Sequence, residues 1–264
     1  MEKMVEQRGH THDRLTDKGE VRLPGPAVRS TADSPPSAAT VRALAAVPAF
    51  ADLEPSTLVE LAAVCGHRCY PKGQVIFHRG DPGDYLYVLV EGRVMVALFS
   101  ATGGRMVVDT CAPPAVFGEV ALLDGGVRTA SVETLAPTRV LTVGRADFLA
   151  LVRDHPALLE SLLRVVGLLL RQTLERNSDL MFLDLQGRVA KNLVQLATSR
   201  GVVTPAGVTV ELGITQAAFS DMVGGSRPMV NQILRGLVNR GLLSLHGRTV
   251  TVHDLPGLRH RAGL

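Results

Sequence analysis

The sequence contains no tryptophan, and aromatic side chains make up only 4% of its 264 residues. A folded core must therefore be built from leucine, valine and alanine, and the hydrophobic fraction of 46% is that of an ordinary globular protein. Charge of one sign is also lacking, because 28 Lys and Arg residues face 25 Asp and Glu residues. A formal charge of +3, averaged over the whole chain, does not indicate a protein that binds nucleic acid.

Cysteine is scarce, and no long apolar run is present. The three cysteines, Cys65, Cys69 and Cys111, lack paired CxxC spacing, which predicts inert thiols in a reducing cytoplasm and no metal. The longest apolar stretch, near Ala157–Leu170, contains charged residues and is shorter than the ~20 residues that cross a bilayer. Residues 1–10 carry charges and no apolar segment, so we predict neither a secretory signal nor a membrane partner.

Composition divides the chain into four segments. Residues 1–42 are polar and rich in proline, and they bury too little apolar surface to offset the entropy of ordering, so we predict a disordered extension. Residues 43–153 alternate short β-rich runs with turn residues, a pattern typical of a β-barrel or sandwich. Residues 154–185 are predicted to form a long helix and a hinge, and residues 186–264 a second folded domain.

The apolar period becomes helical at about Pro156 and stays helical for some thirty residues. One alternative is a single amphipathic helix that lies on the core of the barrel. Length favours a homodimer instead, because a small barrel cannot cover a helix of roughly 45 Å. The positions that would form a coiled-coil seam follow alternating steps of four and three: Leu159, Leu163, Val166, Leu170, Thr173, Asn177 and Leu180.

The order of elements after residue 186 is that of a winged helix-turn-helix. A helix over Arg188–Arg200 precedes a short strand, and Thr215 is the expected N-cap of a helix over Gln216–Val223. A glycine-rich turn leads into a second helix over Arg227–Arg240, and a hairpin around His246 follows as the wing. Such a module places its second helix in the major groove of DNA.

The most informative run is FGEVALLDGGVRTAS at residues 117–131. The guanidinium of Arg128 can bond a phosphate through two N–H groups, and Thr129 adds a hydroxyl. The carboxylate of Glu119 can hold a pair of hydroxyl groups, and Gly118 allows a close approach of the backbone. A carboxylate for ribose and a guanidinium for phosphate fit a nucleotide that carries one charge. The alternative is an ordinary Glu–Arg salt bridge at the surface.

This run resembles the phosphate-binding cassette of cyclic nucleotide-binding domains. With the later helix-turn-helix, the resemblance covers about residues 43–253 and is to bacterial CRP/FNR-type transcription regulators. It implies an α+β fold made of a β-jelly-roll cyclic-nucleotide-binding domain, a long dimerisation helix and a winged helix-turn-helix domain. It also implies a cytoplasmic regulator whose partners are double-stranded DNA, a second copy of the chain and RNA polymerase. We predict no enzyme, because neither G-x-S-x-G nor H-E-x-x-H occurs.

The resemblance assigns roles in a ligand site. Glu119 would bind the ribose 2′-hydroxyl, and Arg128 and Thr129 would bind the cyclic phosphate. Thr173 would meet the purine base, and the implied effector is cyclic AMP, with cyclic GMP as the alternative. Backbone groups of four further residues would line the phosphate: Gly118, Ala121, Leu122 and Ala130.

Leu174 departs from the family pattern, because the cyclic AMP receptor proteins carry a hydroxyl at this position, supplied by the partner chain. The preference for a base therefore stays open. A second hypothesis also stays open, in which the protein binds DNA with no small effector or with a different one. The operator sequence, the target genes and the choice between activation and repression are not predicted.

The run from Val223 to Leu234 resembles the family's turn and recognition helix. Arg227 matches the arginine that reads guanine, since a guanidinium bonds O6 and N7 of that base. Gln232 replaces a second arginine and can pair with adenine, so we expect a different operator. The residues predicted to contact DNA are Thr215, Gln216, Ser226, Arg227, Met229, Asn231, Gln232 and Arg248.

The small total charge hides an uneven distribution. Residues 186–264 contain nine Lys and Arg against three Asp and Glu and so carry a formal charge of +6, whereas the rest of the chain carries −3. An acidic segment with the predicted nucleotide site is therefore joined to a basic segment with the predicted DNA-binding domain. In a dimer the basic faces would add up on one side, where phosphates could use them. The distribution favours a nucleic-acid partner, although the total does not.

Overall fold

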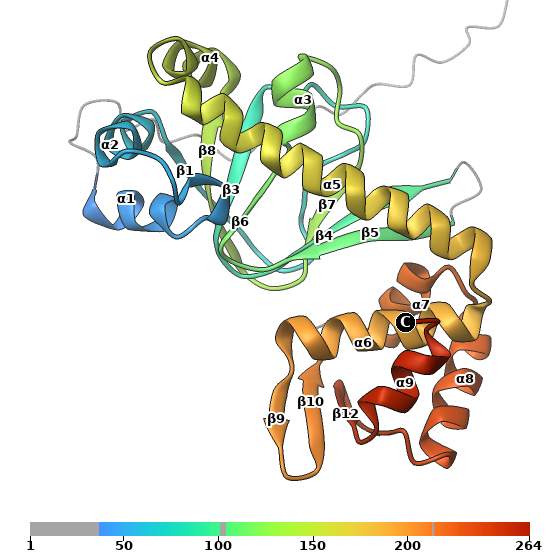
Figure 1. The fold of residues 1–264 in the computed structure, drawn as a ribbon. Helices are drawn as coiled ribbons and strands as arrows, with labels where there is room; N and C mark the ends of the chain where they lie inside the picture. Colours follow the sequence, from blue (N-terminus) through green and yellow to red (C-terminus); the bar gives the residue numbers. More distant parts are fainter. Residues whose placement is uncertain (1–36, 101–103, 213) are drawn as a thin grey trace, which may run out of the picture.

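The computed structural model describes residues 37–100, 104–212 and 214–264. Figure 1 shows two domains connected by one long helix. The predicted α+β fold is confirmed, because a domain of two β-sheets comes first and a helix-turn-helix domain comes second.

The beginning of the described chain differs from the prediction. The sequence predicts disorder up to residue 42, but helix α1 (Ala38–Ala45) already occupies residues 38–42, so the prediction is wrong for this stretch. The hydroxyl of Ser37 caps α1 by accepting a hydrogen bond from the backbone N–H of Thr40 at 3.1 Å. Leu44 then anchors the helix in the core. The rest of the predicted extension, residues 1–36, lies outside the described residues.

The first domain is a jelly-roll-like pair of four-stranded antiparallel sheets with the strand orders β1-β8-β3-β6 and β2-β7-β4-β5. Its strands are β1 (Gly66–Tyr70), β2 (Val75–Phe77), β3 (Tyr85–Glu91), β4 (Val94–Phe99), β5 (Arg105–Cys111), β6 (Ala115–Phe117), β7 (Ser131–Thr134) and β8 (Thr138–Gly144). Its helices after α1 are η1 (Pro48–Phe50), α2 (Pro55–Ala63), α3 (Glu119–Asp124) and α4 (Arg145–Asp154).

Strand β3 shows how this domain forms two hydrophobic cores. Successive side chains of a strand point to opposite faces. Leu86 and Val88 therefore join the core beneath the helices, while Tyr87 and Leu89 join a second core between the sheets. The apolar run that the sequence shows for β3 is the consequence of burial on both faces.

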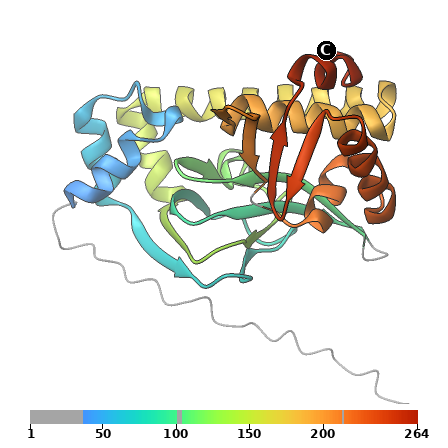
Figure 2. The same ribbon diagram turned by 90° about the horizontal axis from the view of Figure 1, so that it is seen from below.

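Helix α5 (Pro156–Phe182) is the long helix that the sequence predicts, and it runs along both domains (Figures 1 and 2). Its first turns are fixed in the core of the first domain, where Leu158 and Leu162 are fully buried. The helix then leaves the core, and large apolar side chains become exposed along it. Leu163, Leu170 and Leu174 are each more than half exposed.

The second domain is the predicted winged helix-turn-helix. Thr215 caps α7 as predicted, because its hydroxyl accepts a hydrogen bond from the backbone N–H of Ala218 at 3.1 Å. The wing is the predicted hairpin, and its strands belong to a sheet with the order β11-β12-β10-β9. The elements are α6 (Leu185–Arg200), β9 (Val202–Thr204), β10 (Gly207–Glu211), α7 (Gln216–Val223), α8 (Arg227–Asn239), β11 (Leu243–His246), β12 (Thr249–Val252) and α9 (Leu255–Arg261).

The two domains pack directly against each other. Met95 and Ala97 of β4 and Val107 of β5 belong to the same hydrophobic cluster as Phe219 of α7. Figure 1 shows α7 beside the β4–β5 hairpin. The hairpin of the first domain therefore supports the first helix of the helix-turn-helix.

Candidate functional site

A cavity of about 300 Å³ lies in the first domain, between the β-sheets, α3 and the middle of α5. This volume is at the lower end of the range for small-molecule sites, about 300–1,000 Å³. Six of the residues predicted to hold a nucleotide lie in its wall: Gly118, Glu119, Ala121, Arg128, Thr129 and Ala130. The wall does not include Leu122, which is fully buried in the core beneath α3.

Arg128 is the central charged group of this cavity. Its side chain is 3% exposed, and its guanidinium lies over the rings of Phe77 and Tyr87, 4.3 and 5.5 Å from their centroids. Its Nη1 donates a hydrogen bond to the carbonyl of Gly118 at 3.0 Å, and its Nη2 donates to the carbonyl of Tyr85 at 2.8 Å. Two of the few aromatic residues thus hold the guanidinium by cation–π contacts.

Arg128 has no close anionic partner in the described part of the protein, although the more distant charges of Asp84 and Asp81 favour its charged form. No carboxylate there forms an ion pair with it, and its Nε is buried without a hydrogen-bond partner. Burial lowers the pKa of the guanidinium from its ordinary value. A buried cation with an unsatisfied N–H is costly unless an anion binds to it.

The backbone beside the Arg128 guanidinium requires a glycine at position 118. Its φ angle of +82° lies in the left-handed region, which favours glycine. A Cβ atom at this position would lie 2.7 Å from Nη1 of Arg128. Any other residue would therefore strain the turn and also displace the guanidinium.

Glu119 brings a carboxylate into the same cavity. Its side chain is 8% exposed, and burial raises the pKa of the carboxyl group, an effect that a hydrogen bond from its own backbone and the charge of Arg128 only partly oppose. A hydroxyl group that donates a hydrogen bond to this carboxylate would favour its ionised form. The arrangement is suited to the hydroxyl groups of a sugar.

Strand β5 forms a wall of the cavity that the sequence analysis did not single out. Val108, Asp109 and Cys111 line the cavity from this strand. The register of β4 against β5 shifts at Val108, since Val96 pairs with Asp109 and Ala97 pairs with Val107. Such a bulge leaves one residue out of the ladder and turns the neighbouring side chains. No sequence signal marks it.

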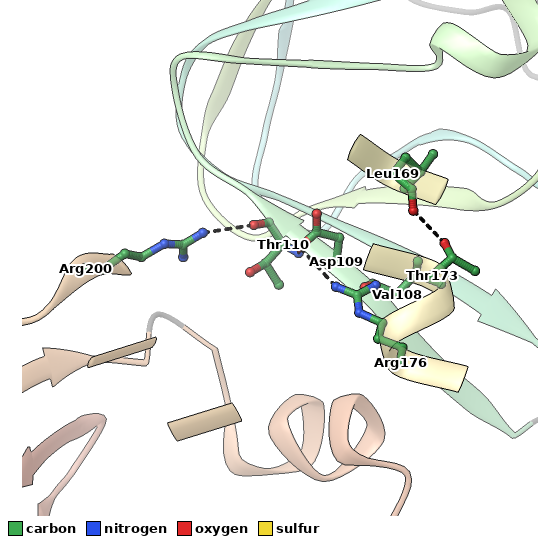
Figure 3. A network of polar contacts seen from close by, with 7 residues as sticks. All are labelled: Val108, Asp109, Thr110, Leu169, Thr173, Arg176 and Arg200. Carbon is green, nitrogen blue, oxygen red and sulfur yellow. Dashed lines mark hydrogen bonds and ion pairs between the residues drawn. The ribbon is translucent and has the colours of Figure 1, made fainter. Parts of the chain in front are cut away.

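Arginines from two helices hold this bulged strand (Figure 3). Arg176 of α5 donates a hydrogen bond to the carbonyl of Val108, and its Nη2 lies 3.9 Å from Oδ1 of Asp109. Arg200 of α6 donates to the carbonyl of Thr110 at 3.3 Å. The strand that lines the cavity is therefore fixed both to the long helix and to the second domain.

Thr173 does not line this cavity. Its hydroxyl donates a hydrogen bond to the carbonyl of Leu169, one turn earlier in α5, at 2.8 Å (Figure 3). It lines a neighbouring cavity of about 310 Å³ between the two domains, which shares Val108, Thr129, Ala130 and Leu169 with the first. Within one chain, the α5 residues that line the first cavity include Leu168 and Gln172 instead.

Two of the three cysteines have strongly raised pKa values because they are buried. Burial raises the pKa of Cys65 to about 12, and burial together with the nearby Asp109 and Glu119 raises the pKa of Cys111 to about 12. All three thiols are unpaired, and Cys69 is exposed. Among the described residues, no group of three or more His, Cys, Asp or Glu side chains could hold a metal ion.

The surface predicted to contact DNA lies on α7, α8 and the wing. Val230, Leu234 and Leu237 are the buried face of α8. The predicted DNA-contacting residues point outward with one exception, Asn231, which is half-buried; the exposed ones are Thr215, Gln216, Ser226, Arg227, Met229, Gln232 and Arg248. Ser226 occupies the N-cap position of α8, but its side chain makes no capping hydrogen bond. Arg235, one turn beyond Asn231, adds an exposed cation that the prediction omitted.

A compact hinge connects α5 to the second domain. Asp184 caps α6 by accepting a hydrogen bond from the backbone N–H of Gly187 at 2.7 Å. Arg188 donates hydrogen bonds to the carbonyls of Leu183 and Val223, and so joins the hinge to the end of α7. Nζ of Lys191 lies 2.6 Å from Oδ1 of Asp179. These contacts join the end of α5 to α6 and to the end of α7.

Fold and site together define a two-domain protein that joins a domain with a cavity for a small molecule to a helix-turn-helix domain. Residues 67–155 match the model of the cyclic nucleotide-binding domain, and residues 187–261 match the Crp-like helix-turn-helix domain. In the described part of the chain, no helix is long and apolar enough to pass through a membrane.

Known proteins of similar sequence match most of the chain. The chain is 34% identical over 213 residues to the CRP-like cAMP-activated global transcriptional regulator of Mycobacterium tuberculosis, across 81% of this chain and 95% of that protein. It is 31% identical to the cAMP-activated global transcriptional regulator CRP of Pasteurella multocida, across 75% of this chain and 94% of that protein. The fold is similar to the c-di-GMP responsive global regulator CLP of Xanthomonas campestris, with a TM-score of 0.68, 23% identity and coverage of 76% and 99%.

The chain belongs to the CRP/FNR family of transcription regulators. It combines a cyclic nucleotide-binding domain with a DNA-binding helix-turn-helix, as the sequence predicts. Members of this family are transcription regulators and not enzymes.

Proposed function

We propose that the protein is a homodimeric transcription regulator whose binding to an operator is controlled by a cyclic nucleotide. Cyclic AMP is the favoured effector, because relatives at 31–34% identity are named as cAMP-activated. Cyclic GMP is the alternative. The observation that carries the proposal is Arg128, a cation with 3% exposure and an unpartnered buried Nε in the wall of a small-molecule cavity.

The cavity supplies a partner for each part of a cyclic nucleotide. Arg128 offers its Nε–H and its positive charge to the cyclic phosphate, with the hydroxyl of Thr129 beside it. Glu119 accepts a hydrogen bond from the ribose 2′-hydroxyl. The bound phosphate neutralises the buried guanidinium, and the bound ribose favours the ionised carboxylate. Two groups that are costly alone become satisfied together.

The exposed apolar stripe of α5 supports the dimer. Leu163, Leu170 and Leu180 of the predicted seam are 55%, 58% and 52% exposed in the single chain. A helix with its middle and end uncovered by its own domain is stabilised when a second copy covers it. Two-fold symmetry would then present two recognition helices to successive major grooves, about 34–36 Å apart.

Strand β5 connects the cavity proposed for the effector directly to the helix-turn-helix domain. Asp109 and Cys111 line the nucleotide cavity. On the same strand, Val107 packs in the hydrophobic cluster of the second domain, and the carbonyl of Thr110 accepts a hydrogen bond from Arg200. An effector that contacts β5 or α5 shifts the population between two placements of the helix-turn-helix. Contact with RNA polymerase and a cytoplasmic location follow from the proposed role as a regulator of transcription.

A binding assay on DNA tests the proposal. Operators are selected from a pool of random duplexes, with and without nucleotide, and the affinity of the selected duplex is measured at one salt concentration. We expect cyclic AMP to raise the affinity of the wild-type protein for the selected duplex at least tenfold. We expect no increase for Arg128→Ala, and an undiminished increase for Arg139→Ala, a control at an exposed arginine of the same domain.

Leu174 favours a second candidate function. Its apolar side chain, 59% exposed, offers no hydrogen bond to a base from the partner chain. In this case the protein would bind its operator with no small effector, or with a different one. Full affinity for the operator without nucleotide, unchanged by cyclic AMP and cyclic GMP, would support this candidate and contradict the first.

A further inference from the structure

The polar groups in the wall of the nucleotide cavity fall into two sets. Arg128 and Thr129 suit a phosphate, and Glu119 suits a ribose. Among the described residues that line the cavity, the polar side chains that remain are those of Asp109, Cys111 and Gln172. A base that enters with the phosphate and ribose would therefore meet this second set.

Asp109 is the charged member of the second set. It follows the bulge at Val108, which turns its side chain relative to a regular strand. It lies two residues before Cys111, so both side chains face the cavity from β5. The side chain of Asp109 is 44% exposed, so it borders the cavity and also meets solvent.

The carboxylate of Asp109 is oriented and still able to accept hydrogen bonds. Its Oδ1 accepts a hydrogen bond from the backbone N–H of Thr110 at 2.7 Å and lies 3.9 Å from Nη2 of Arg176. Both contacts use Oδ1, and Oδ2 makes no hydrogen bond to the described residues. An ionised carboxylate is an acceptor only, with room for about four hydrogen bonds. Figure 3 shows Asp109 beside Val108, with Arg176 reaching them from α5.

We propose that Asp109 is the specificity-determining residue of this cavity and that its carboxylate admits guanine by accepting hydrogen bonds from the base. Guanine presents two adjacent donors, the ring N1–H and the exocyclic 2-amino group, which match the two oxygens of a carboxylate. Adenine presents one amino group flanked by ring nitrogens that are acceptors, and these repel the second oxygen. Asp109 therefore raises the affinity for cyclic GMP relative to cyclic AMP, so that cyclic GMP also becomes a ligand of this cavity.

This inference rests on the proposed function, because it assigns the base-reading residue of the same nucleotide site. It concerns a side chain on β5 and is independent of Thr173 and Leu174 on α5. Gln172 lines the cavity from α5, and its amide both donates and accepts hydrogen bonds, so it does not by itself select one purine.

Titration calorimetry with three nucleotides tests the inference. Cyclic AMP, cyclic GMP and cyclic IMP are titrated into the full-length protein and into Asp109→Ala and Asp109→Asn. Cyclic IMP has the ring N1–H of guanine but lacks the 2-amino group. The control is Glu91→Ala, which removes an exposed carboxylate at the end of β3, away from the cavity.

We expect Asp109→Ala to weaken cyclic GMP about tenfold or more, which is the discrimination of a two-bond contact to a base. Cyclic IMP should weaken by a smaller factor, and cyclic AMP by less than about threefold. Asp109→Asn should show the same order, and Glu91→Ala should leave all three affinities unchanged.

An equal loss for all three nucleotides would overturn the inference, because a purely structural role of Asp109 would weaken each ligand alike. An unchanged affinity for cyclic GMP in Asp109→Ala would overturn it as well. If the unchanged protein binds none of the three nucleotides, the proposed function fails, and this inference fails with it.

Discussion

Nε and Nη2 of Arg105 on β5 lie 2.8 and 2.7 Å from Oδ2 of Asp221 on α7, which joins the sensor domain to the first helix of the helix-turn-helix. The two side chains are 32% and 27% exposed, so water screens the pair only in part. Because β5 also lines the cavity that we propose for the nucleotide, through Asp109 and Cys111, one strand connects this cavity to the helix-turn-helix. The connection lies within a single chain.

The strength of this connection can be measured by a double-mutant cycle. Arg105→Ala and Asp221→Ala each remove the pair, and we expect a coupling of about 0.5–1 kcal/mol in the free energy of unfolding, as for partly exposed ion pairs. The exchange of charges in Arg105→Asp with Asp221→Arg should recover part of it. Urea denaturation at low salt gives the energies, and additive effects of the two alanine substitutions would show that the pair carries no coupling.

The carboxyl group of Glu119 makes the stability of the nucleotide-free protein depend on pH. Burial raises its pKa in the folded state above the ordinary value of 4.5. The folded state therefore binds the proton more tightly than the unfolded state, and this carboxyl group costs stability as the pH rises above its unfolded pKa. The cost becomes constant once the pH passes the folded pKa.

Replacement of this group separates stability from binding. We expect Glu119→Gln to have a higher free energy of unfolding than the unchanged protein at pH 7–8, with a difference that shrinks toward pH 4. We expect the same variant to bind cyclic AMP more weakly, because it lacks the charged acceptor for the ribose. Denaturation curves across this pH range, without nucleotide, provide the measurement. A difference that grows as the pH falls would contradict the burial of an ionisable group here.

A single sequence motif supplies six predicted residues to one cavity wall, whereas contacts between distant parts of the chain could not be predicted. Glycine, carboxylate and guanidinium stand close together in residues 118–128, so their chemistry is visible in sequence. Arg105 and Asp221 are 116 positions apart, and nothing in either local pattern reveals the partner. The bulge that turns Asp109 is likewise a property of strand register and not of one residue type.

Two further differences have simple physical reasons. Residues 1–42 are polar, and the buried side chain that anchors α1, Leu44, lies just beyond them. The start of α1 therefore falls inside a stretch predicted to be disordered. Thr173 is predicted to reach a base, but within one chain its hydroxyl bonds to the preceding turn of α5. Its contact with a base stays a prediction for the dimer with bound nucleotide.

The role of the exposed apolar residues of α5 in dimerisation can be tested by introducing a charge among them. We expect Leu170→Glu, alone or with Leu163→Glu, to convert a dimer into a monomer, since a charge buried in a dimer seam is unpaired. Both side chains are more than half exposed in the single chain, so its fold should persist. Sedimentation velocity measures the mass. The control is Glu175→Lys, which changes an exposed residue of α5 that is not part of the predicted seam. A dimer of unchanged stability in Leu170→Glu would place the interface elsewhere.

Arg227 lies at the first position of α8 with an exposed side chain. We expect Arg227→Ala to weaken binding to the selected operator by about 1–3 kcal/mol and to relax the preference at one guanine. Arg248→Ala in the wing should instead weaken all duplexes alike and make binding less dependent on salt. Fluorescence anisotropy at several salt concentrations separates the two effects, and an equal loss on operator and random DNA would rule out base reading by Arg227.

The most direct test of nucleotide control is calorimetry with cyclic AMP and cyclic GMP on the full-length protein, beside Arg128→Ala. We predict saturable binding of one nucleotide per chain, lost in Arg128→Ala and kept in Arg139→Ala. Absence of heat up to millimolar nucleotide, with the unchanged protein and Arg128→Ala giving identical traces, would contradict it.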